Sequence, residues 1–163
     1  MEVAVQEDGA AAGDATTSTR HVERSIDLPA EVDEVWGALT DPDRIERWFG
    51  AEVTWDLRPG GEVLVGPGDD GAPSRRGEVD EVVAGRRLRF RWWPDASGGD
   101  DASAVTYVLT PRDGGTRLVV TEVPLATPVA GRAQAMAASA GSAWALRLVG
   151  LWLGCHTRVL VQA

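Results

Sequence analysis

The chain has 163 residues but only one cysteine, Cys155, and it contains neither lysine nor asparagine. A single cysteine excludes a disulfide within the chain and a metal site built from several thiolates, so a reducing compartment fits. The N-terminus lacks the basic and apolar segments of a secretory signal. The longest apolar stretch runs from Ala143 to Cys155 and is interrupted by Arg147. This stretch is too short for a membrane span. We therefore expect a cytoplasmic protein without membrane insertion.

Positive charge is also scarce, since 16 arginines face 25 acidic residues and the net charge is −9. Nucleic-acid affinity depends mainly on neutralising phosphates, and a chain of this charge repels them. The one tight basic cluster runs from Arg86 to Arg91 and alternates with apolar residues, which indicates the solvent face of a strand. We expect no nucleic-acid partner.

Histidine is too sparse to support the common catalytic and metal-binding arrangements. His21 stands near the start of the chain, and His156 follows Cys155 directly. Neighbours on a helix diverge by about 100°, so Cys155 and His156 cannot form a nucleophile–base dyad. The paired acids at 69–70 and 100–101 stand in glycine-rich turns without a histidine nearby. The sequence predicts no catalytic dyad, no metal site and no cofactor.

What the chain has in excess is tryptophan, with seven residues against two phenylalanines and one tyrosine. With 44% hydrophobic and 25% charged residues, the composition is that of one globular domain. Residues 1–19 are rich in alanine, glycine, threonine and acid without apolar periodicity, so we expect a disordered tail there. Residues 20–163 should form the folded domain.

Hydrophobic periodicity predicts an α+β order of elements over that domain. Residues 21–28 alternate as a first strand, and two short amphipathic helices follow over 31–39 and 42–49. Five to six antiparallel strands come next, at 53–57, 63–65, 78–83, 86–93, 105–109 and 116–123. The chain then turns helical after Pro128, with a break at Gly141 and a long final helix over 142–161. On that helix Trp144, Leu148 and Cys155 share the apolar side, and Arg147 falls on the wet side.

This order and several short motifs resemble one known group of proteins. The motifs are Arg24 with Pro29, Val35 to Pro42, Arg47-Trp48-Phe49, Gly60-Gly61, Gly77-Glu78-Val79, Arg87-Leu88 with Trp92, Gly114 to Leu118, and Trp144. Together they resemble the START-like or SRPBCC superfamily, and within it the Aha-type family of heat-shock protein 90 ATPase activator homologues. The family commonly has glycine before the tryptophan of its last helix, whereas this chain has Ala143. The resemblance implies a helix-grip fold, in which a curved antiparallel sheet wraps around the long C-terminal helix.

The helix-grip resemblance also implies a cavity between sheet and terminal helix that takes small hydrophobic molecules. Aromatic and aliphatic residues on the inward registers would bind the ligand, and they are Trp48, Trp55, Phe90, Trp92, Tyr107, Trp144, Leu148 and Trp152. The alternative is that these side chains only fill the core. Trp36 is expected to pack beneath the first helix, and Trp93 to lie at the rim or on the outer face.

Two charged residues, Arg24 and Glu122, also fall on inward registers. A lone buried charge is costly, so they should pair if the first and last strands are neighbours. That pair would be purely structural, or with Tyr107 it would orient a polar group of the ligand. A register error of one residue would instead place both in water.

The sequence therefore favours a protein that binds or carries a small hydrophobic molecule, aromatic or lipid-like. One alternative is a polyketide cyclase or dehydratase that uses the same cavity, with Arg24, Tyr107 and Glu122 as its candidate residues. Another alternative is a co-chaperone-like interaction module. The wide apolar arc of the last helix also allows a homodimer.

Overall fold

A computed structural model describes residues 21–126 and 130–161, without the side chains of residues 130–139 and 156–161. The tail expected over 1–19 lies outside the described residues. The elements are β1 (Val22–Leu28), α1 (Val32–Thr40), α2 (Pro42–Phe49), β2 (Val53–Trp55), β3 (Glu62–Val65), β4 (Arg75–Val83), β5 (Arg87–Pro94), a 3-10 turn η1 (Asp95–Ser97), β6 (Ser103–Arg112), β7 (Gly115–Pro124) and α3 (Ala130–Val161).

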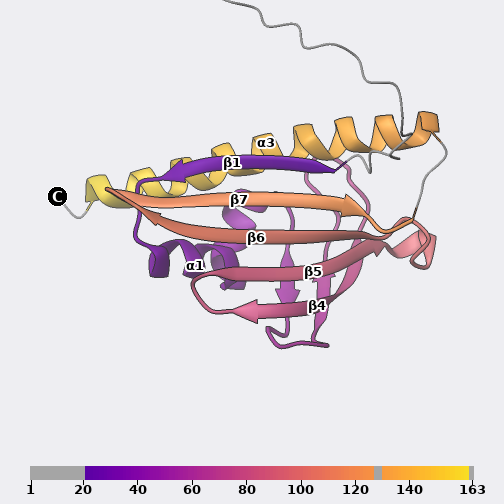
Figure 1. The fold of residues 1–163 in the computed structure, drawn as a ribbon, viewed down its shortest axis with the longest axis horizontal. Helices are drawn as coiled ribbons and strands as arrows, with labels where there is room; N and C mark the ends of the chain where they lie inside the picture. Colours follow the sequence, from indigo (N-terminus) through magenta and orange to yellow (C-terminus); the bar gives the residue numbers. More distant parts are fainter. Residues whose placement is uncertain (1–20, 127–129, 162–163) are drawn as a thin grey trace, which may run out of the picture.

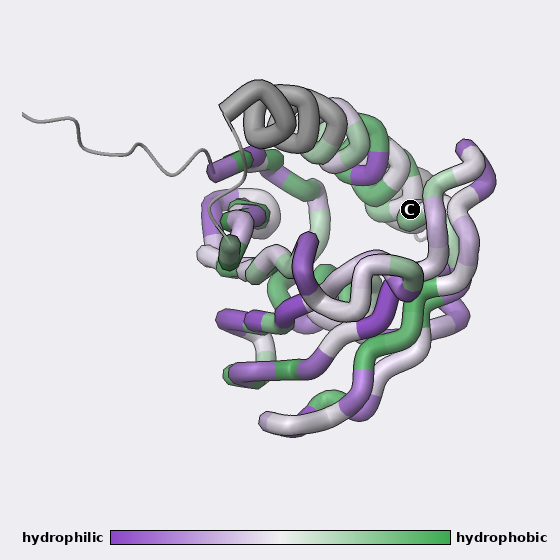
Figure 2. Tube along the Cα trace, turned by 90° about the vertical axis from the view of Figure 1, so that its right-hand side faces the viewer, coloured by the Kyte–Doolittle hydropathy of each residue, from purple (hydrophilic) through white to green (hydrophobic). Residues whose placement is uncertain are grey.

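The seven strands form one antiparallel sheet in the order β1-β7-β6-β5-β4-β3-β2. The helix α3 runs along β1 on one side of this sheet (Figure 1). Seen from the side, the strands curve beneath α3 (Figure 2). The α+β helix-grip fold predicted from the sequence is confirmed.

The two short helices are separated by one residue that serves both of them. Asp41 donates its backbone N–H to the Gly37 carbonyl at the end of α1, and its side chain accepts from the Asp43 backbone N–H in the first turn of α2. Proline at the first position of α2 suits this cap, because its missing N–H would have no helical partner there. Gly50 ends α2 in the left-handed region with φ 76°. The chain reversal that points α2 toward α3 is thus encoded locally.

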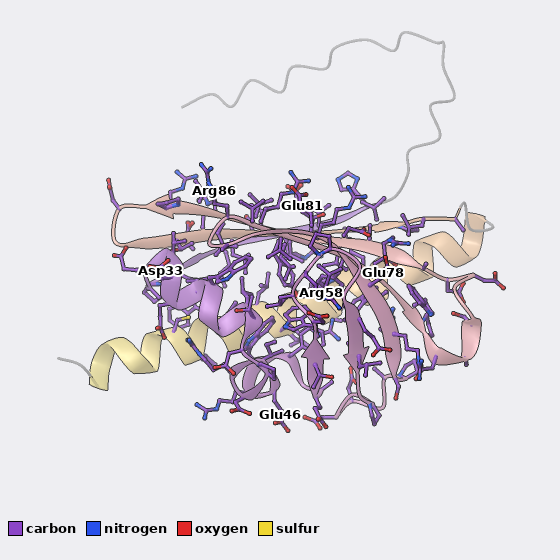
Figure 3. All side chains as sticks on the ribbon, turned by 90° about the horizontal axis from the view of Figure 1, so that it is seen from below. Asp33, Glu46, Arg58, Glu78, Glu81 and Arg86 are labelled. Atoms are coloured by element: carbon purple, nitrogen blue, oxygen red, sulfur yellow. The ribbon has the colours of Figure 1, made fainter. Side chains whose placement is uncertain are left out.

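Alternation along β5 gives the sheet its two faces. Leu88, Phe90 and Trp92 are buried, whereas Arg87 is exposed and Arg89 and Arg91 are half-buried. On the outer face the arginines pair with acids of β4, as Arg91 Nε does with Asp80 Oδ1 at 2.8 Å. Figure 3 shows Glu81 and Arg86 pointing away from the interior, on the side opposite Glu46. The concave face, which β5 shares with its neighbours, carries the core.

Two features curve the sheet over the core. The pairing of β4 with β5 shifts register between Val79 and Glu81, which marks a β-bulge. Gly77 lies opposite Trp92, and a methyl group at Gly77 would overlap the backbone oxygen of Arg91. Because the two backbones approach so closely there, only glycine fits.

The helix α3 differs from its prediction in two ways. It is continuous across Gly141, so the expected break there is wrong. The apolar arc is also narrower than expected, because Leu146 and Val149 lie on the outer face, and Leu146 is 76% exposed. The homodimer suggested by that arc stays a prediction. No helix within the described ranges combines the length and apolarity that a membrane crossing requires.

Two glycine substitutions test this account of the sheet and α3. Gly77→Ala should lower the free energy of unfolding by about 1–3 kcal/mol, because the methyl group has no space between β4 and β5. Gly154→Ala should raise it by about 0.5–1 kcal/mol, because the position is helical and its surroundings are open. Guanidinium denaturation monitored by circular dichroism measures both values. A Gly77→Ala variant as stable as the parent would contradict the close approach.

Candidate functional site

The centre of the interior is a buried carboxylate, that of Glu122 on β7. Its side chain is on the concave face, as the alternation of β7 predicted, and the residue is only 7% exposed. The Trp92 indole Nε1–H donates to Oε1 at 2.9 Å, and the Trp144 Nε1–H donates to Oε2 at 2.7 Å. The carboxylate thereby joins β7, β5 and α3. Two charge-assisted hydrogen bonds offset part of the cost of removing it from water.

The expected pair of Arg24 with Glu122 does not form. The strands β1 and β7 are neighbours as predicted, and Arg24 lies opposite Val120 on the inward register. However, β1 is the edge strand, and the long arginine side chain passes beside Gly141 of α3 to solvent. There its Nη1 donates to the Glu23 carbonyl at 3.0 Å.

Aromatic rings surround the carboxylate on the side away from β7. Trp92 and Trp144 stack with centroids 6.0 Å apart and planes 26° apart. Phe49 meets the two indoles edge-on at 6.1 and 6.0 Å, and Tyr107 meets Trp144 at 5.8 Å. Phe90 contacts Trp92, Tyr107 and Trp55 in the same T-shaped manner. Such edge-to-face pairs are favourable beyond the area that they bury.

Arg147, which the helical wheel placed in water, lies in this cluster instead. Its guanidinium carbon is 4.1 Å from the Phe49 ring centroid, 5.0 Å from Trp144 and 5.8 Å from Trp92. Its Nε donates to the Phe49 carbonyl at 3.3 Å. Burial lowers the pKa of Arg147, and the nearby Tyr107 and Glu122 oppose that shift. The signal was present in the sequence, because at about 100° per residue Arg147 is only about 60° from Trp144, closer than Trp152 at about 80°.

Tyr107 brings the one phenol of the chain into the same space. The residue is 1% exposed, and burial raises the pKa of its hydroxyl well above the usual value, so the group stays protonated. No hydrogen bond to this hydroxyl is made by the described residues. A buried hydroxyl normally finds a partner, so this group keeps hydrogen-bonding capacity that the described residues do not use.

The space that remains among these side chains is small. A cavity of about 10 Å³ lies between sheet and helices, about the minimum for one water molecule. Five of the predicted binding residues line it, namely Trp48, Trp55, Phe90, Trp92 and Tyr107. Phe49, over whose ring the Arg147 guanidinium lies, also lines it. The interior is filled by its own rings.

The remaining predicted residues lie around this cavity rather than in its wall. Trp144 closes it from the α3 side through its stack on Trp92, and Leu148 is buried one turn further along α3. Trp152 is half-buried and packs on the edge of the core, as Trp36 does. Trp93 is half-buried on the opposite register from Trp92.

A second cavity of about 90 Å³ lies between α1, α2 and α3. Its wall includes Glu34, Arg44, Gly150, Gly154 and Cys155. Trp48 lines both this cavity and the interior one, so this residue borders the two spaces. Its Nε1–H donates to the Ala38 carbonyl at 2.9 Å, which fixes the ring in that place. Within the described residues no group of three histidine, cysteine or acidic side chains could hold a metal ion.

Comparison with known proteins agrees with this architecture. The sequence model of the Activator of Hsp90 ATPase homolog 1-like proteins matches residues 29–149. None of the curated proteins compared with the chain matches it.

Solved structures of similar proteins extend the comparison. CalU16 from Micromonospora echinospora is 28% identical with a TM-score of 0.66, covering 86% of this chain and 78% of its own. DynU16, a protein of the dynemicin biosynthetic locus, is 30% identical with a TM-score of 0.68 over 81% of this chain; the chain spans 45% of the length of DynU16. Protein MLL2253 from Mesorhizobium loti has a TM-score of 0.69 at 22% identity, covering 82% of this chain and 94% of its own, and shows the fold alone.

The two indole bonds to Glu122 make a testable contribution to stability. Glu122→Gln should lower the free energy of unfolding by about 1–3 kcal/mol, because the amide nitrogen would face an indole N–H and leave that donor unpaired. Trp92→Phe combined with Glu122→Gln should cost less than the sum of the single changes, since the two groups interact directly. Denaturation curves of the four proteins measure the coupling. Glu62→Gln, at an exposed position of β3, is the control, and full additivity would contradict the assignment.

Proposed function

The chain belongs to the family of Activator of Hsp90 ATPase homolog 1-like proteins, with the helix-grip fold of the SRPBCC superfamily, and from this premise we propose that it binds a small, ring-containing hydrophobic molecule. The site is the space between the concave face of the sheet and α3. The ligand takes its place among Phe49, Trp92, Tyr107 and Trp144. The role is that of a binder or carrier in the cytoplasm.

The observation that carries this proposal is a polar centre inside an aromatic shell. A core that served stability alone would need neither the Glu122 carboxylate nor the Arg147 guanidinium, since apolar residues of similar volume are often at least as stabilising. Ligand pockets, in contrast, combine aromatic walls with a few polar groups that orient the ligand. The Tyr107 hydroxyl is such a group, because the described residues leave it without a hydrogen bond.

A ligand must displace side chains, because the interior cavity holds about 10 Å³. The neighbouring cavity of about 90 Å³ supplies an access route, since Trp48 lines both cavities. A single hydrogen bond, to the Ala38 carbonyl, holds that indole. Rotation of Trp48 would join the two spaces without moving the sheet.

The similar structures support a small-molecule role. DynU16 is described as a protein of a biosynthetic locus, and it is 30% identical over 81% of this chain. A binder of ring-containing biosynthetic intermediates would be consistent with that context. We do not extend the proposal to catalysis by Glu122, because both of its oxygens already accept an indole N–H.

The test uses anthracene-1-carboxamide, a neutral ring probe that accepts energy from excited tryptophan. We expect saturable energy transfer in the parent chain, because bound anthracene would lie against Trp92 and Trp144. Val63→Ala should tighten binding by about fifteenfold, since it removes two carbons that the ligand must otherwise displace, each worth about 0.8 kcal/mol.

The matched control is Val79→Ala, which makes the same change at a fully buried position outside the cavity wall. Its affinity for the probe should equal that of the parent. No saturable transfer in the parent chain, or equal effects of Val63→Ala and Val79→Ala, would contradict the proposed site.

A further inference from the structure

Two of the half-buried arginines differ from the others because they form no ion pair with the described residues. Six arginines are half-buried in the described part of the chain, and four of them pair with a carboxylate: Arg44, Arg89, Arg91 and Arg117. The two that lie within ion-pair distance of no carboxylate among the described residues are Arg75 and Arg147. A half-buried cation without a counter-ion is costly, so these two positions need an explanation.

Both unpaired guanidiniums lie over the same ring, although they come from different elements. Arg75 is the first residue of β4, on the concave register that continues with Gly77 and Val79. Its guanidinium carbon is 4.7 Å from the centroid of Trp92, and that of Arg147 is 5.8 Å from the same centroid. Repulsion from Arg75 contributes to the lowered pKa of Arg147, so the two charges act on one another.

The acidic groups nearby are already engaged. Both oxygens of Glu122 accept indole N–H groups. Asp70 is close enough to favour the charged form of Arg147, but its Oδ1 accepts from the Ala72 backbone N–H, and it forms no ion pair with either arginine.

Both arginines keep guanidinium N–H groups that donate no hydrogen bond to the described residues. Arg75 makes no side-chain hydrogen bond within the described part of the chain, and Arg147 makes only the one from Nε to Phe49. The two terminal nitrogens of Arg147 make no hydrogen bond with the described residues, and they are not fully covered by protein atoms. They therefore border space that solvent reaches.

We propose that Arg75 and Arg147 form an anion subsite, and that the ligand of the proposed function is a planar ring compound carrying a carboxylate. A guanidinium binds a carboxylate through two parallel hydrogen bonds, and it also stacks on aromatic faces, so one arginine can serve both parts of such a ligand. The ring of the ligand lies along Trp92 and Phe49, and its carboxylate lies between the two guanidiniums. This inference rests on the proposed function and adds the charge of the ligand to it.

The experiment compares anthracene-1-carboxylate with anthracene-1-carboxamide, which have the same ring and differ in charge. In the parent chain we expect the carboxylate to bind about tenfold more tightly, as a charge-assisted hydrogen bond provides. Arg75→Gln should remove most of this preference, while the carboxamide still binds with saturation, which also shows that the variant is folded. Arg75→Lys should keep part of the preference.

The control is Arg76→Gln, which removes the same charge one residue away, where the side chain is exposed and pairs with Asp95. It should keep the preference in about 0.15 M salt, where charges more than about 8 Å apart are largely screened. Equal affinity for the two probes in the parent would overturn the anion subsite and leave the proposed function standing. Equal losses in Arg75→Gln and Arg76→Gln would also overturn it, and binding of neither probe would overturn both proposals.

Discussion

The arrangement of sheet and helix depends on one buried carboxylate, that of Glu122. Glu122 places a carboxylate between sheet and helix, where it is stable only with donors aimed at it, and the Trp92 and Trp144 indoles supply them. That requirement fixes the rotation of α3 over β5 and β7, because both indole nitrogens must point at one residue. The same rotation brings Arg147 inward over Phe49 and turns Leu146 outward.

The indoles also act as spacers between the layers. Among the described residues, the backbone of α3 approaches α2 and the edge strand β1 most closely. The central strands lie farther away, and the stacked rings of Trp92 and Trp144, with Tyr107 against them, fill the intervening space. A ring-shaped ligand of similar thickness could occupy part of this layer after a side-chain rotation, without a new arrangement of the backbone. A filled interior and a binding function are therefore compatible.

Much of this was readable from the sequence. Alternation along β5 and β7 correctly predicted that Phe90, Trp92 and Glu122 face inward, and helical periodicity correctly predicted the two short helices. These features depend on neighbours along the chain, where period and capping chemistry are decisive. The burial of the aromatic residues followed from the same periods.

What the sequence could not supply were partners from distant elements. Arg24 has the right register, but its freedom to reach solvent follows from the position of β1 at the sheet edge and from Gly141 beside it. The helical wheel predicted Arg147 on the solvent side because charged side chains of an amphipathic helix usually face water. In the structure, aromatic rings from α2, β5 and α3 cover it. Sequence spacing shows which residues share a face of one helix, but not which rings another element brings to that face.

The central claim is that the carboxylate-centred aromatic cluster is a binding centre and more than a core. Its most direct test is nuclear magnetic resonance of the seven indole N–H groups, assigned by single Trp→Phe variants, during titration with anthracene-1-carboxamide. We expect the Trp92 and Trp144 signals to shift with saturation while those of Trp36 and Trp93 stay in place. Unchanged Trp92 and Trp144 signals at saturating probe would contradict it.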